Sequence, residues 1–401
     1  MLSVAEARSR ILAGFAQLSA EQVALPAALD RVLAEDVHAR LTQPPFAVSA
    51  MDGYAVRAGD VAKVPVRLKI AGYAQAGGEI APRLSPGEAA RIFTGATLPE
   101  GADAIVIQED TESSGGEVLV KESSRVGTYV RAAGLDFRAG DLGIPAGKRL
   151  NARDIGLAAA MNHAWLRVRR RPRVAVMPTG DEIVMPGDPR RPQQIVSSNG
   201  LALAAFLARA GAEPIDLGIA ADNREALQRL AAGAAGADLL VTTGGASVGD
   251  HDLVRAALGE RGMEVDFWKI AMRPGKPVMF GRIGAVPVLG LPGNPVSSLV
   301  CAAIFLKPVL RKMLGEPDLG EETETAIAGR DLAENDSRQD YLRSRLSRDS
   351  SGRLVATPFD RQDSSMLFIL QQADCLLIRP PRGPALPAGT TVPILRLDEA
   401  V

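Results

Sequence analysis

The feature that most constrains the fold is an alternation of strand and helix patterns that begins at Arg173. An apolar run there leads to a helix pattern, and the same order then recurs along the chain. The strand patterns cover 173–177, 213–217, 238–242 and 263–268, and helix patterns follow Asn199, Asp222 and Asp250. Strands and helices at this spacing form parallel βαβ units. This region is predicted to be a doubly wound α/β domain.

The chain on either side of this alternation follows different patterns. Helix patterns run from Ser3 to about Leu18 and from Asn151 to about Met161, each opened by a capping residue. A β-like segment lies near 23–39, and short strand-like runs separated by Gly, Pro and Asp turns dominate 55–150. Two short strands, 277–281 and 286–290, lead to a helix from Asn294, and a β pattern follows it. We therefore predict a multidomain α/β chain.

Composition excludes several classes of protein. The 46 basic and 47 acidic side chains nearly cancel, so no strong attraction to nucleic acid or to an anionic membrane is expected. The first residues lack the pattern of a secretory signal, and the apolar stretches 201–210 and 299–306 are too short to span a membrane. Two cysteines, Cys301 and Cys375, cannot form a disulfide framework. We expect a cytoplasmic protein that binds neither nucleic acid nor membrane.

A glycine-rich loop after the third strand pattern is the first candidate site. It reads Thr242-Thr243-Gly244-Gly245-Ala246-Ser247-Val248-Gly249-Asp250 and leads into a helix. Glycines allow backbone N–H groups to approach an anion closely, and a helix N-terminus favours negative charge. Gly244, Gly245 and Ser247 are therefore candidate phosphate-binding residues. The alternative is a capped βα turn without a ligand.

Three known catalytic or nucleotide-binding patterns are excluded. Gly245–Gly249 fits the G-x-S-x-G elbow of serine hydrolases, which needs an acid and then a histidine well downstream of the serine. The only histidine after Ser247 is His251, so this triad cannot be built. The chain also contains neither a Walker A run nor a G-x-G-x-x-G fingerprint at the start of the βαβ region.

Two further turns carry groups suited to an anion. In Leu291–Ser298 an asparagine occupies the N-cap of a helix and a serine lies in its first turn. In Met272–Pro277 two cations flank a tight turn, where the compact ammonium of a lysine suits an oxyanion. The alternatives are a capped core helix and a pair of surface cations. The candidate residues are Arg273, Lys276, Pro277, Gly293, Asn294 and Ser297.

Carboxylates follow the ends of the predicted strands. Asp181 and Glu182 come just after the first strand, and Asp250 and Asp252 come after the third. Ligands of doubly wound sheets bind at this edge, and carboxylates beside an anion site repel the anion unless Mg²⁺ bridges them. The set therefore predicts a metal-assisted phosphate site, although helix capping is the alternative for each carboxylate singly. Asp52 and Asp222 complete the set.

Taken together, these segments resemble the molybdopterin molybdenumtransferase family, the MoeA proteins and the E domain of gephyrin. The resemblance runs nearly end to end and rests on six segments in the same order: Ser49–Ala55, Ile92–Ala96, Pro178–Glu182, Thr242–Asp252, Pro274–Pro277 and Leu291–Ser297. It implies a central doubly wound βαβ domain with a mostly parallel sheet at 172–317, a β-rich inserted domain at 46–139 and a C-terminal β domain at 318–401. Residues 1–45 and 140–171 would form a discontinuous, elongated N-terminal domain of mixed α/β structure.

The resemblance also implies a reaction and its participants. Such proteins hydrolyse adenylylated molybdopterin, release AMP and insert molybdenum from the substrate molybdate, with a divalent metal, usually Mg²⁺. They form homodimers whose cleft lies between the βαβ domain of one subunit and the inserted domain of the other. The adenylyltransferase and apo-molybdoenzymes are candidate further partners.

Site residues are carried over from the family by matching position. The catalytic candidates are Asp52, Thr94, Asp136, Glu182, Asp222, Asp252 and Lys276. The metal candidates are Glu182, Asp222, Asp250 and Asp252, and Ser297 and Arg343 match residues near the molybdate. Many relatives have a lysine where this chain has Arg273, which keeps the charge but changes the contact geometry.

Two other functions are weighed against this one. The first is the related adenylyltransferase, which resembles only the βαβ domain and has a similar T-x-G-G-T/S loop; the Ser49–Tyr54 run and the extra domains argue against it. The second is a scaffold or binding module such as the gephyrin E domain. The cleft carboxylates, which a scaffold does not need, argue against the second.

Overall fold

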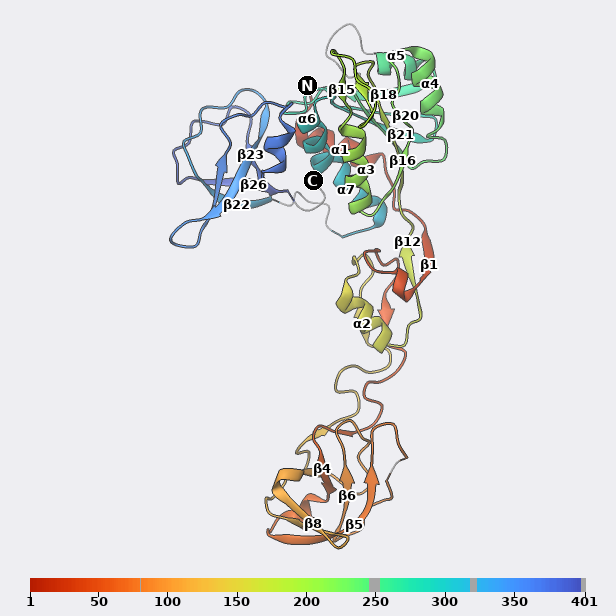
Figure 1. The fold of residues 1–401 in the computed structure, drawn as a ribbon, viewed down its shortest axis with the longest axis vertical. Coiled ribbons are helices and arrows are strands. Elements are labelled where there is room, and N and C mark those ends of the chain that lie inside the picture. The colour runs from red at the N-terminus through yellow and green to blue at the C-terminus, as the bar shows by residue number, and fades with distance from the viewer. Residues whose placement is uncertain (80, 245–252, 318–322, 398–401) are drawn as a thin grey trace.

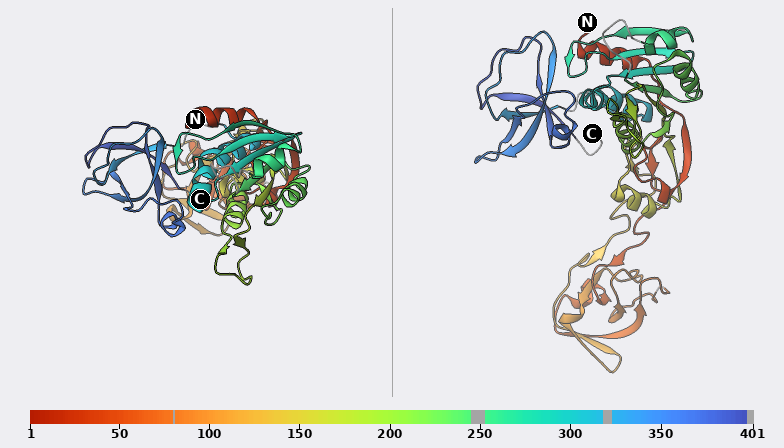
Figure 2. Two further views of the ribbon diagram at one scale, coloured as in Figure 1. Left: turned by 90° about the horizontal axis from the view of Figure 1, so that it is seen from above. Right: turned by 45° about the horizontal axis from the view of Figure 1, so that its top comes forward.

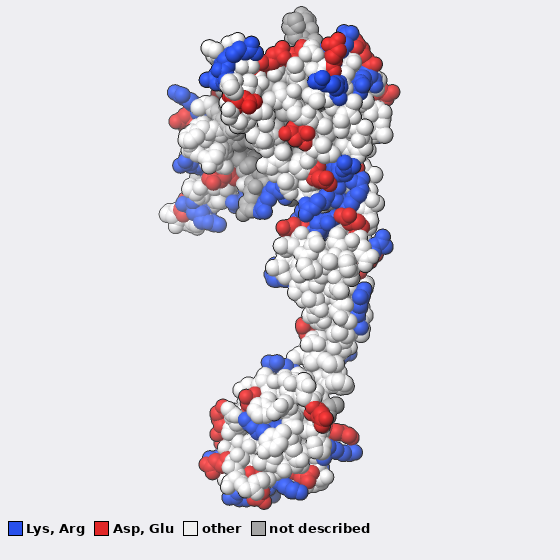
Figure 3. All heavy atoms as spheres, turned by 45° about the vertical axis from the view of Figure 1, so that its right-hand side comes forward, with Lys and Arg blue, Asp and Glu red and all other residues white. Residues whose placement is uncertain are grey.

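A computed structural model describes residues 1–79, 81–244, 253–317 and 323–397. The molecule is elongated, with the βαβ unit and a C-terminal β unit at one end, a small module around α2 in the middle and a β lobe at the far end (Figures 1 and 2). In the described part of the chain no helix has both the length and the apolar character needed to cross a membrane. Basic and acidic side chains are interspersed on both ends of the face drawn in Figure 3, in keeping with the near-neutral composition.

The βαβ unit is built on a six-stranded sheet of order β16-β13-β17-β21-β20-β18. The first four strands are parallel, which confirms the doubly wound prediction. β20 runs antiparallel to β21, and the edge strand β18 runs antiparallel to β20. β18 therefore points in the same direction as the four parallel strands, although it does not pair with any of them. The strands are β13 (Arg173–Pro178), β16 (Glu213–Asp216), β17 (Leu239–Thr243), β18 (Met263–Trp268), β20 (Met279–Ile283) and β21 (Val286–Leu291).

Helices cover both faces of this sheet. One core joins α3 and the α6–α7 stretch to the sheet, and a second core lies under α4 and α5. The helix α1 also belongs to the first core, because Val4, Ala7 and Ile11 pack there beside Val174 and Phe280. The helices are α1 (Val4–Ala13), α3 (Asn199–Arg209), α4 (Arg224–Ala232), α5 (Leu253–Gly259), α6 (Pro295–Cys301), the π-helical turn η4 (Ala302–Leu306) and α7 (Lys307–Leu314).

Two sequence predictions in the first 45 residues need correction. The first helix ends at Ala13 rather than near Leu18, because Gly14 caps it with its N–H bonded back to Ile11 and Leu12. The segment 23–39 is not a continuous strand, since Pro26 opens a short 3₁₀ turn there. Helix α1 packs in the core of the βαβ unit and Leu25–Ala39 contribute to a separate cluster, and the proposed domain limits stay predictions.

A small module connects the βαβ unit to the far lobe. β1 (Ala20–Ala24) pairs with β12 (Trp165–Arg169), and β2 (Val37–His38) pairs with β11 (Leu142–Ile144). The predicted helix after Asn151 is confirmed as α2 (Ala152–Ala160). Its capping box pairs the Asn151 side chain with the N–H of Asp154, and the Asp154 carboxylate with the N–H of Asn151.

The far lobe is a six-stranded sheet of order β7-β4-β6-β5-β9-β8, as the β-rich pattern predicted. The short β3 and β10 pair beside it and bring the chain in and out of the lobe. The strands are β3 (Val48–Ser49), β4 (Gly53–Val56), β5 (Val66–Ala74), β6 (Glu88–Ile92), β7 (Ala104–Ile107), β8 (Thr111–Ser114), β9 (Glu117–Val120) and β10 (Val130–Arg131).

The C-terminal unit is a β barrel. Its sheet has the order β19-β23-β24-β22-β26-β25, and the pairing of β23 with β25 closes it. β19 comes from the βαβ unit and runs parallel to β23, so the two units share one sheet. The elements are β19 (Met272–Arg273), β22 (Thr323–Ala328), β23 (Gln339–Arg348), β24 (Leu354–Pro358), α8 (Leu367–Gln371), β25 (Cys375–Arg379) and β26 (Thr391–Arg396).

We expect Asp238→Asn to destabilise the βαβ unit at neutral pH by about 1–3 kcal/mol. The carboxylate accepts hydrogen bonds from Arg170 at 2.6 and 2.7 Å and from the N–H of Arg173 at 2.8 Å. Burial raises the pKa of Asp238, but these partners lower the pKa by more than burial raises it. The pKa of Asp238 in the folded state therefore lies below its value in the unfolded state. The stabilisation is therefore present above the unfolded pKa and lost as the pH falls through the folded pKa.

Urea unfolding of wild type and variant at pH 7 and at pH 3 measures this effect. The difference in unfolding free energy shrinks at pH 3 if the ion pair is its source. An equal difference at both pH values contradicts the electrostatic explanation.

Candidate functional site

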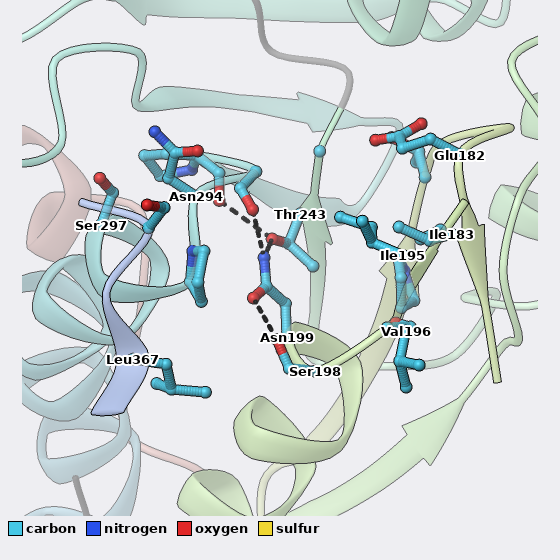
Figure 4. Close-up of a pocket in the computed structure, with 18 of the residues that line it drawn as sticks. Glu182, Ile183, Ile195, Val196, Ser198, Asn199, Thr243, Asn294, Ser297 and Leu367 are labelled. Atoms are coloured by element: carbon cyan, nitrogen blue, oxygen red, sulfur yellow. Dashed lines mark hydrogen bonds between the residues drawn. The ribbon is translucent and has the colours of Figure 1, made fainter. Parts of the chain in front are cut away.

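A pocket of about 700 Å³ lies where β13, β17 and β21 end (Figure 4). This is the carboxyl edge of the parallel strands, where doubly wound sheets bind ligands. Glu182 with Ile183, Ile195 and Val196 forms one wall, and Asn294 and Ser297 lie on the other (Figure 4). The remaining lining residues are Pro178, Thr179, Ser197, Ser198, Asn199, Thr243, Gly244, Lys276, Pro277, Pro292, Gly293, Pro295, Ser365 and Leu367.

Asn199 joins the two loops that form the floor of the pocket. Its Nδ2 donates to Thr243 Oγ1 at 3.0 Å and to the carbonyl of Gly293 at 2.8 Å. Thr243 Oγ1 in turn donates to the carbonyl of Pro292 at 3.1 Å. The ends of β17 and β21 are therefore held in a fixed relation by one amide (Figure 4).

The glycines of these loops are required by the close approach of their backbones. Gly293 lies against Gly244, since a Cβ on Gly293 would meet the Gly244 Cα at 3.3 Å. Gly244 has φ +98°, and a Cβ there would lie 2.3 Å from the carbonyl oxygen of Thr179. Gly244 and Gly293, two of the predicted binding residues, line the pocket, whereas Gly245, Ser247, Asp250 and Asp252 lie outside the described residues.

We expect Gly244→Ala to lower the free energy of unfolding by about 1–3 kcal/mol, from backbone strain and the clash with Thr179. Denaturant unfolding measures the change. Gly259→Ala is the matched control, because nothing lies within 4 Å of its Cβ position and its φ is ordinary. Equal stabilities of the two variants would show that the loop relaxes around the added methyl group.

The lysine turn supplies a cation to the pocket. Lys276 and Pro277 line it, and no hydrogen bond or ion pair joins the Lys276 ammonium to any residue that the structure describes. Gly275, with φ +116°, lets the turn approach α6, because a Cβ there would lie 2.5 Å from Cys301 Sγ. The ammonium is thus held at the pocket by a tightly packed turn and is available to an anionic ligand.

Two buried hydroxyl groups add polar contacts. Thr179 is 2% exposed, lines the pocket and has an Oγ1 without a hydrogen-bond partner in the described part of the chain. Ser297, a predicted binding residue, is 4% exposed and lines the opposite wall. Buried hydroxyls normally find a partner, so both suit the polar part of a ligand.

The predicted metal ligands are only partly brought together. Glu182 lines the pocket, and Asp222 lies near it: burial raises the pKa of Asp222, and the charges of Asp181 and Glu182 raise it further. A cation between these carboxylates would relieve that repulsion, so the donor set suits a divalent metal. Within the described ranges, however, no group of three or more Asp, Glu, His or Cys is arranged to hold a metal ion.

Two predicted helix caps are corrected by the structure. The helix α4 is capped by Asn223, whose Oδ1 accepts the N–H of Ala226, and not by Asp222. Asn294 occupies the N-cap position of α6, but its side chain makes no capping bond and instead donates from Nδ2 to Ser364 Oγ at 2.7 Å. Neither the Asp222 nor the Asn294 side chain caps a helix. This absence of a capping role supports the interpretation of both as site residues.

Two predicted binding residues do not line this pocket. Arg273 is ion-paired with Asp336 at 3.2 Å and with Asp340, both in the C-terminal barrel. Arg343 is fully buried on β23, and its guanidinium nitrogens have no partner among the described residues. The charge of Arg273 is therefore paired with carboxylates of the barrel. The local sequence around Arg273 does not reveal this pairing.

Three predicted catalytic residues lie toward the other end of the molecule. In the far lobe Asp52 Oδ1 accepts the backbone N–H of Thr94 at 2.7 Å and its hydroxyl at 2.8 Å. These bonds hold the pKa of Asp52 below its usual value. Asp136 is exposed beside β10, where the chain leaves the lobe. The structure thus joins Asp52 to Thr94 but separates them from the pocket of the same chain (Figure 1).

Sequence reasoning missed several residues of both sites. The sequence marks Asn199 only as a helix start and Thr179 only as part of a motif, although both residues line the pocket. Arg91 donates to the carbonyl of Gly53 at 2.9 Å beside Asp52. Ser365 lines the pocket from the segment before α8, and no local signal pointed to it because only tertiary packing brings it there.

Comparison with known proteins gives a consistent result over the whole chain. Family models match in three places: "MoeA N-terminal region (domain I and II)" at 2–162, "Probable molybdopterin binding domain" at 175–312 and "MoeA C-terminal region (domain IV)" at 325–397.

Relatives of the same family match at full length. A molybdopterin molybdenumtransferase of Nostoc sp. is 37% identical over 95% of this chain and 89% of its own length. The enzyme of that name from Haemophilus influenzae is 33% identical over 98% of each chain. The crystal structure of a molybdopterin biosynthesis MoeA protein from Pyrococcus horikosii superposes with a TM-score of 0.86 and 34% identity over 99% of each chain. The chain therefore belongs to the molybdopterin molybdenumtransferase family.

Proposed function

We propose that the protein inserts molybdenum into molybdopterin during molybdenum cofactor biosynthesis and that it hydrolyses adenylylated molybdopterin, with release of AMP. The observation that supports this most is the pocket at the ends of β13, β17 and β21. It combines two glycine loops held by Asn199, an ammonium from Lys276 and an apolar wall that includes Ile195. Such a site suits a substrate with a charged phosphate linkage and flat ring systems.

The polar groups of the pocket suggest a role for each of five residues in this reaction. Backbone N–H groups at Gly244 and Gly293 would face the phosphate oxygens. Hydrolysis of the P–O–P linkage would release AMP and leave the other phosphate on molybdopterin, while Lys276 would stabilise the charge that develops on the leaving oxygen. Ser297 would orient molybdate near the dithiolene, and Thr179 would hold a further oxygen.

A divalent cation such as Mg²⁺ supplies charge neutralisation at the linkage when it is bound. Glu182 and Asp222 would hold it from the described part of the chain, and Asp250 and Asp252 are the other predicted ligands. The assignment is supported by the raised pKa of Asp222 and by the preference of Mg²⁺ for carboxylate and phosphate oxygens.

A homodimer would complete the site. Asp52 and Thr94 lie in the far lobe, far from the pocket of their own chain (Figure 1). The lobe of a second copy, laid against the pocket, would bring this pair to the substrate. We further propose cytoplasmic localisation, with the adenylyltransferase and apo-molybdoenzymes as the proteins that supply substrate and accept product.

The test is AMP release from adenylylated molybdopterin with Mg²⁺, measured with and without molybdate. Molybdate-dependent release is the expected result. Adenylylation of free molybdopterin with ATP would instead support the adenylyltransferase function. Absence of both activities in folded, dimeric protein would favour a scaffold.

A further inference from the structure

Arg91 lies between the two chain segments of the far lobe that carry Asp52 and Thr94. It is half-buried on β6, directly opposite Tyr54 of the neighbouring strand β4. β4 begins at the residue after Asp52, and β6 ends two residues before Thr94. The segments that bear the bonded Asp52–Thr94 pair therefore meet the sheet beside Arg91.

The two Nη atoms of Arg91 hold the backbone on the Asp52 side. Nη1 donates to the carbonyl of Gly53 at 2.9 Å, and Nη2 donates to Oε1 of Gln108 at 2.7 Å. Gln108 begins the 3₁₀ turn η3 (Gln108–Asp110), and its N–H donates to the carbonyl of Asp52 at 3.1 Å. These bonds close a ring through Arg91, Gly53, Asp52 and Gln108. The two consecutive carbonyls of Asp52 and Gly53 are thus both held by this ring.

The face of the same guanidinium contacts the Thr94 side. Its central carbon lies 4.8 Å from the ring centroid of Phe93 and 5.3 Å from that of Tyr54. Both distances are within the range of cation–π contacts, which extends to about 6 Å. Phe93 immediately precedes Thr94, whose N–H and hydroxyl donate to Asp52. Arg91 therefore contacts the residue after Asp52 and the residue before Thr94.

The charge of Arg91 also acts on the carboxylate. The two bonds from Thr94 lower the pKa of Asp52 most, burial opposes them, and the positive charge of Arg91 lowers the pKa further. Because both Nη atoms of Arg91 donate elsewhere, this effect is exerted through space. A guanidinium stays charged at every pH relevant to a protein, so the effect is constant.

We propose that Arg91 is a positioning residue for Asp52: it holds the segments on both sides of the Asp52–Thr94 pair, so that the carboxylate is presented in one orientation. The importance of Asp52 for turnover rests on the proposed function, whereas the bonds that position it do not. The alternative is that Arg91 only stabilises the sheet through its cross-strand contact with Tyr54. The two roles differ in one respect, because a positioning residue affects turnover only through Asp52.

The first experiment is a double-mutant cycle on molybdate-dependent AMP release by the full-length protein. We expect Arg91→Gln to lower the rate at least about tenfold, because a reacting group that is not held in place loses much of its effect. In the Asp52→Asn background the same substitution should change the residual rate by less than about twofold. Arg67→Gln is the matched control and should retain the wild-type rate, since Arg67 is an exposed arginine of the adjacent strand β5 that pairs with Glu117.

The second experiment is independent of activity and measures hydrogen exchange of the Thr94 amide by NMR in the full-length protein. This N–H donates to Asp52, so Arg91→Gln should speed its exchange at least about tenfold while the amides of β9 in the same sheet are unchanged. Arg91→Lys keeps the charge but lacks the planar fork, and it should restore part of the protection. Arg67→Gln should leave the exchange of the Thr94 amide as in the wild type.

The two experiments together decide the proposal. A loss of rate that occurs only where Asp52 is intact, with faster exchange at Thr94, supports it. An equal loss of rate in both backgrounds, or unchanged exchange at Thr94 in Arg91→Gln, overturns it. If Arg91→Gln does not fold, Arg91→Lys takes its place in both experiments. If the wild type releases no AMP, the proposed function fails, and exchange at Thr94 alone then decides whether Arg91 positions Asp52.

Discussion

Lys276→Ala is expected to lower molybdate-dependent AMP release at least about 10²-fold while leaving the fold intact. Lys276 lines the pocket and its ammonium is not paired with any described residue, so its removal would leave the developing oxyanion without its cation. Because the main chain of the turn is held by the packing of Gly275 on α6, the substitution should not move the loop. Single-turnover AMP release and circular dichroism measure the two parts of this prediction.

Two further variants make the result specific. Lys63→Ala removes an exposed lysine of the far lobe and should retain full activity. Lys276→Arg keeps the charge but replaces a compact ammonium with a planar guanidinium group. We expect this variant to retain only part of the wild-type rate of AMP release. Full activity of Lys276→Ala would exclude a role for this residue in stabilising the transition state.

Asp52→Ala is expected to abolish turnover in the same assay, although Asp52 lies far from the pocket of its own chain (Figure 1). The carboxylate is fixed by two hydrogen bonds from Thr94 and keeps its charge to low pH, as the lowered pKa shows. It is therefore a preorganised anion on the surface of the lobe. Glu117→Ala, at an exposed position on β9 of the same sheet, is the control and should remain active.

Mixing the two inactive variants tests whether the site is shared between subunits. Co-refolded Asp52→Ala and Lys276→Ala chains would form heterodimers with one intact site, and random pairing predicts about a quarter of the wild-type activity. Recovery of this size supports a site built from two copies. No recovery in a mixture shown to contain heterodimers would place Asp52 and Lys276 in the same chain's site.

The positions of several elements follow from local sequence alone. The strand predicted at 173–177 is observed at Arg173–Pro178, and the helix predicted after Asn151 is observed at Ala152–Ala160, because apolar runs and caps act over neighbouring residues. The loops that line the pocket could also be predicted from local sequence, because the close approach of their backbones requires glycine at positions 244 and 293.

Tertiary structure decided which of these groups meet. Helix α1 is amphipathic by sequence, yet only packing shows that its apolar face belongs to the βαβ core and not to the module that follows it. Arg273 and Lys276 are both cations of the same turn, but Arg273 is ion-paired with the barrel and Lys276 lines the pocket. A side chain's hydrogen-bond partner depends on the segments packed against it, which the sequence around it does not determine.

The sequence by itself therefore determined the family, the strand–helix alternation and the loops at the strand ends, because these depend on local patterns and on matching motifs. Only the tertiary structure decided that Asn199 joins two loops, that Ser365 reaches the pocket, and that Asp340 and Arg379 stand opposite each other on β23 and β25. The physical reason is distance along the chain: these contacts join residues tens of positions apart, and only the folded packing brings them together.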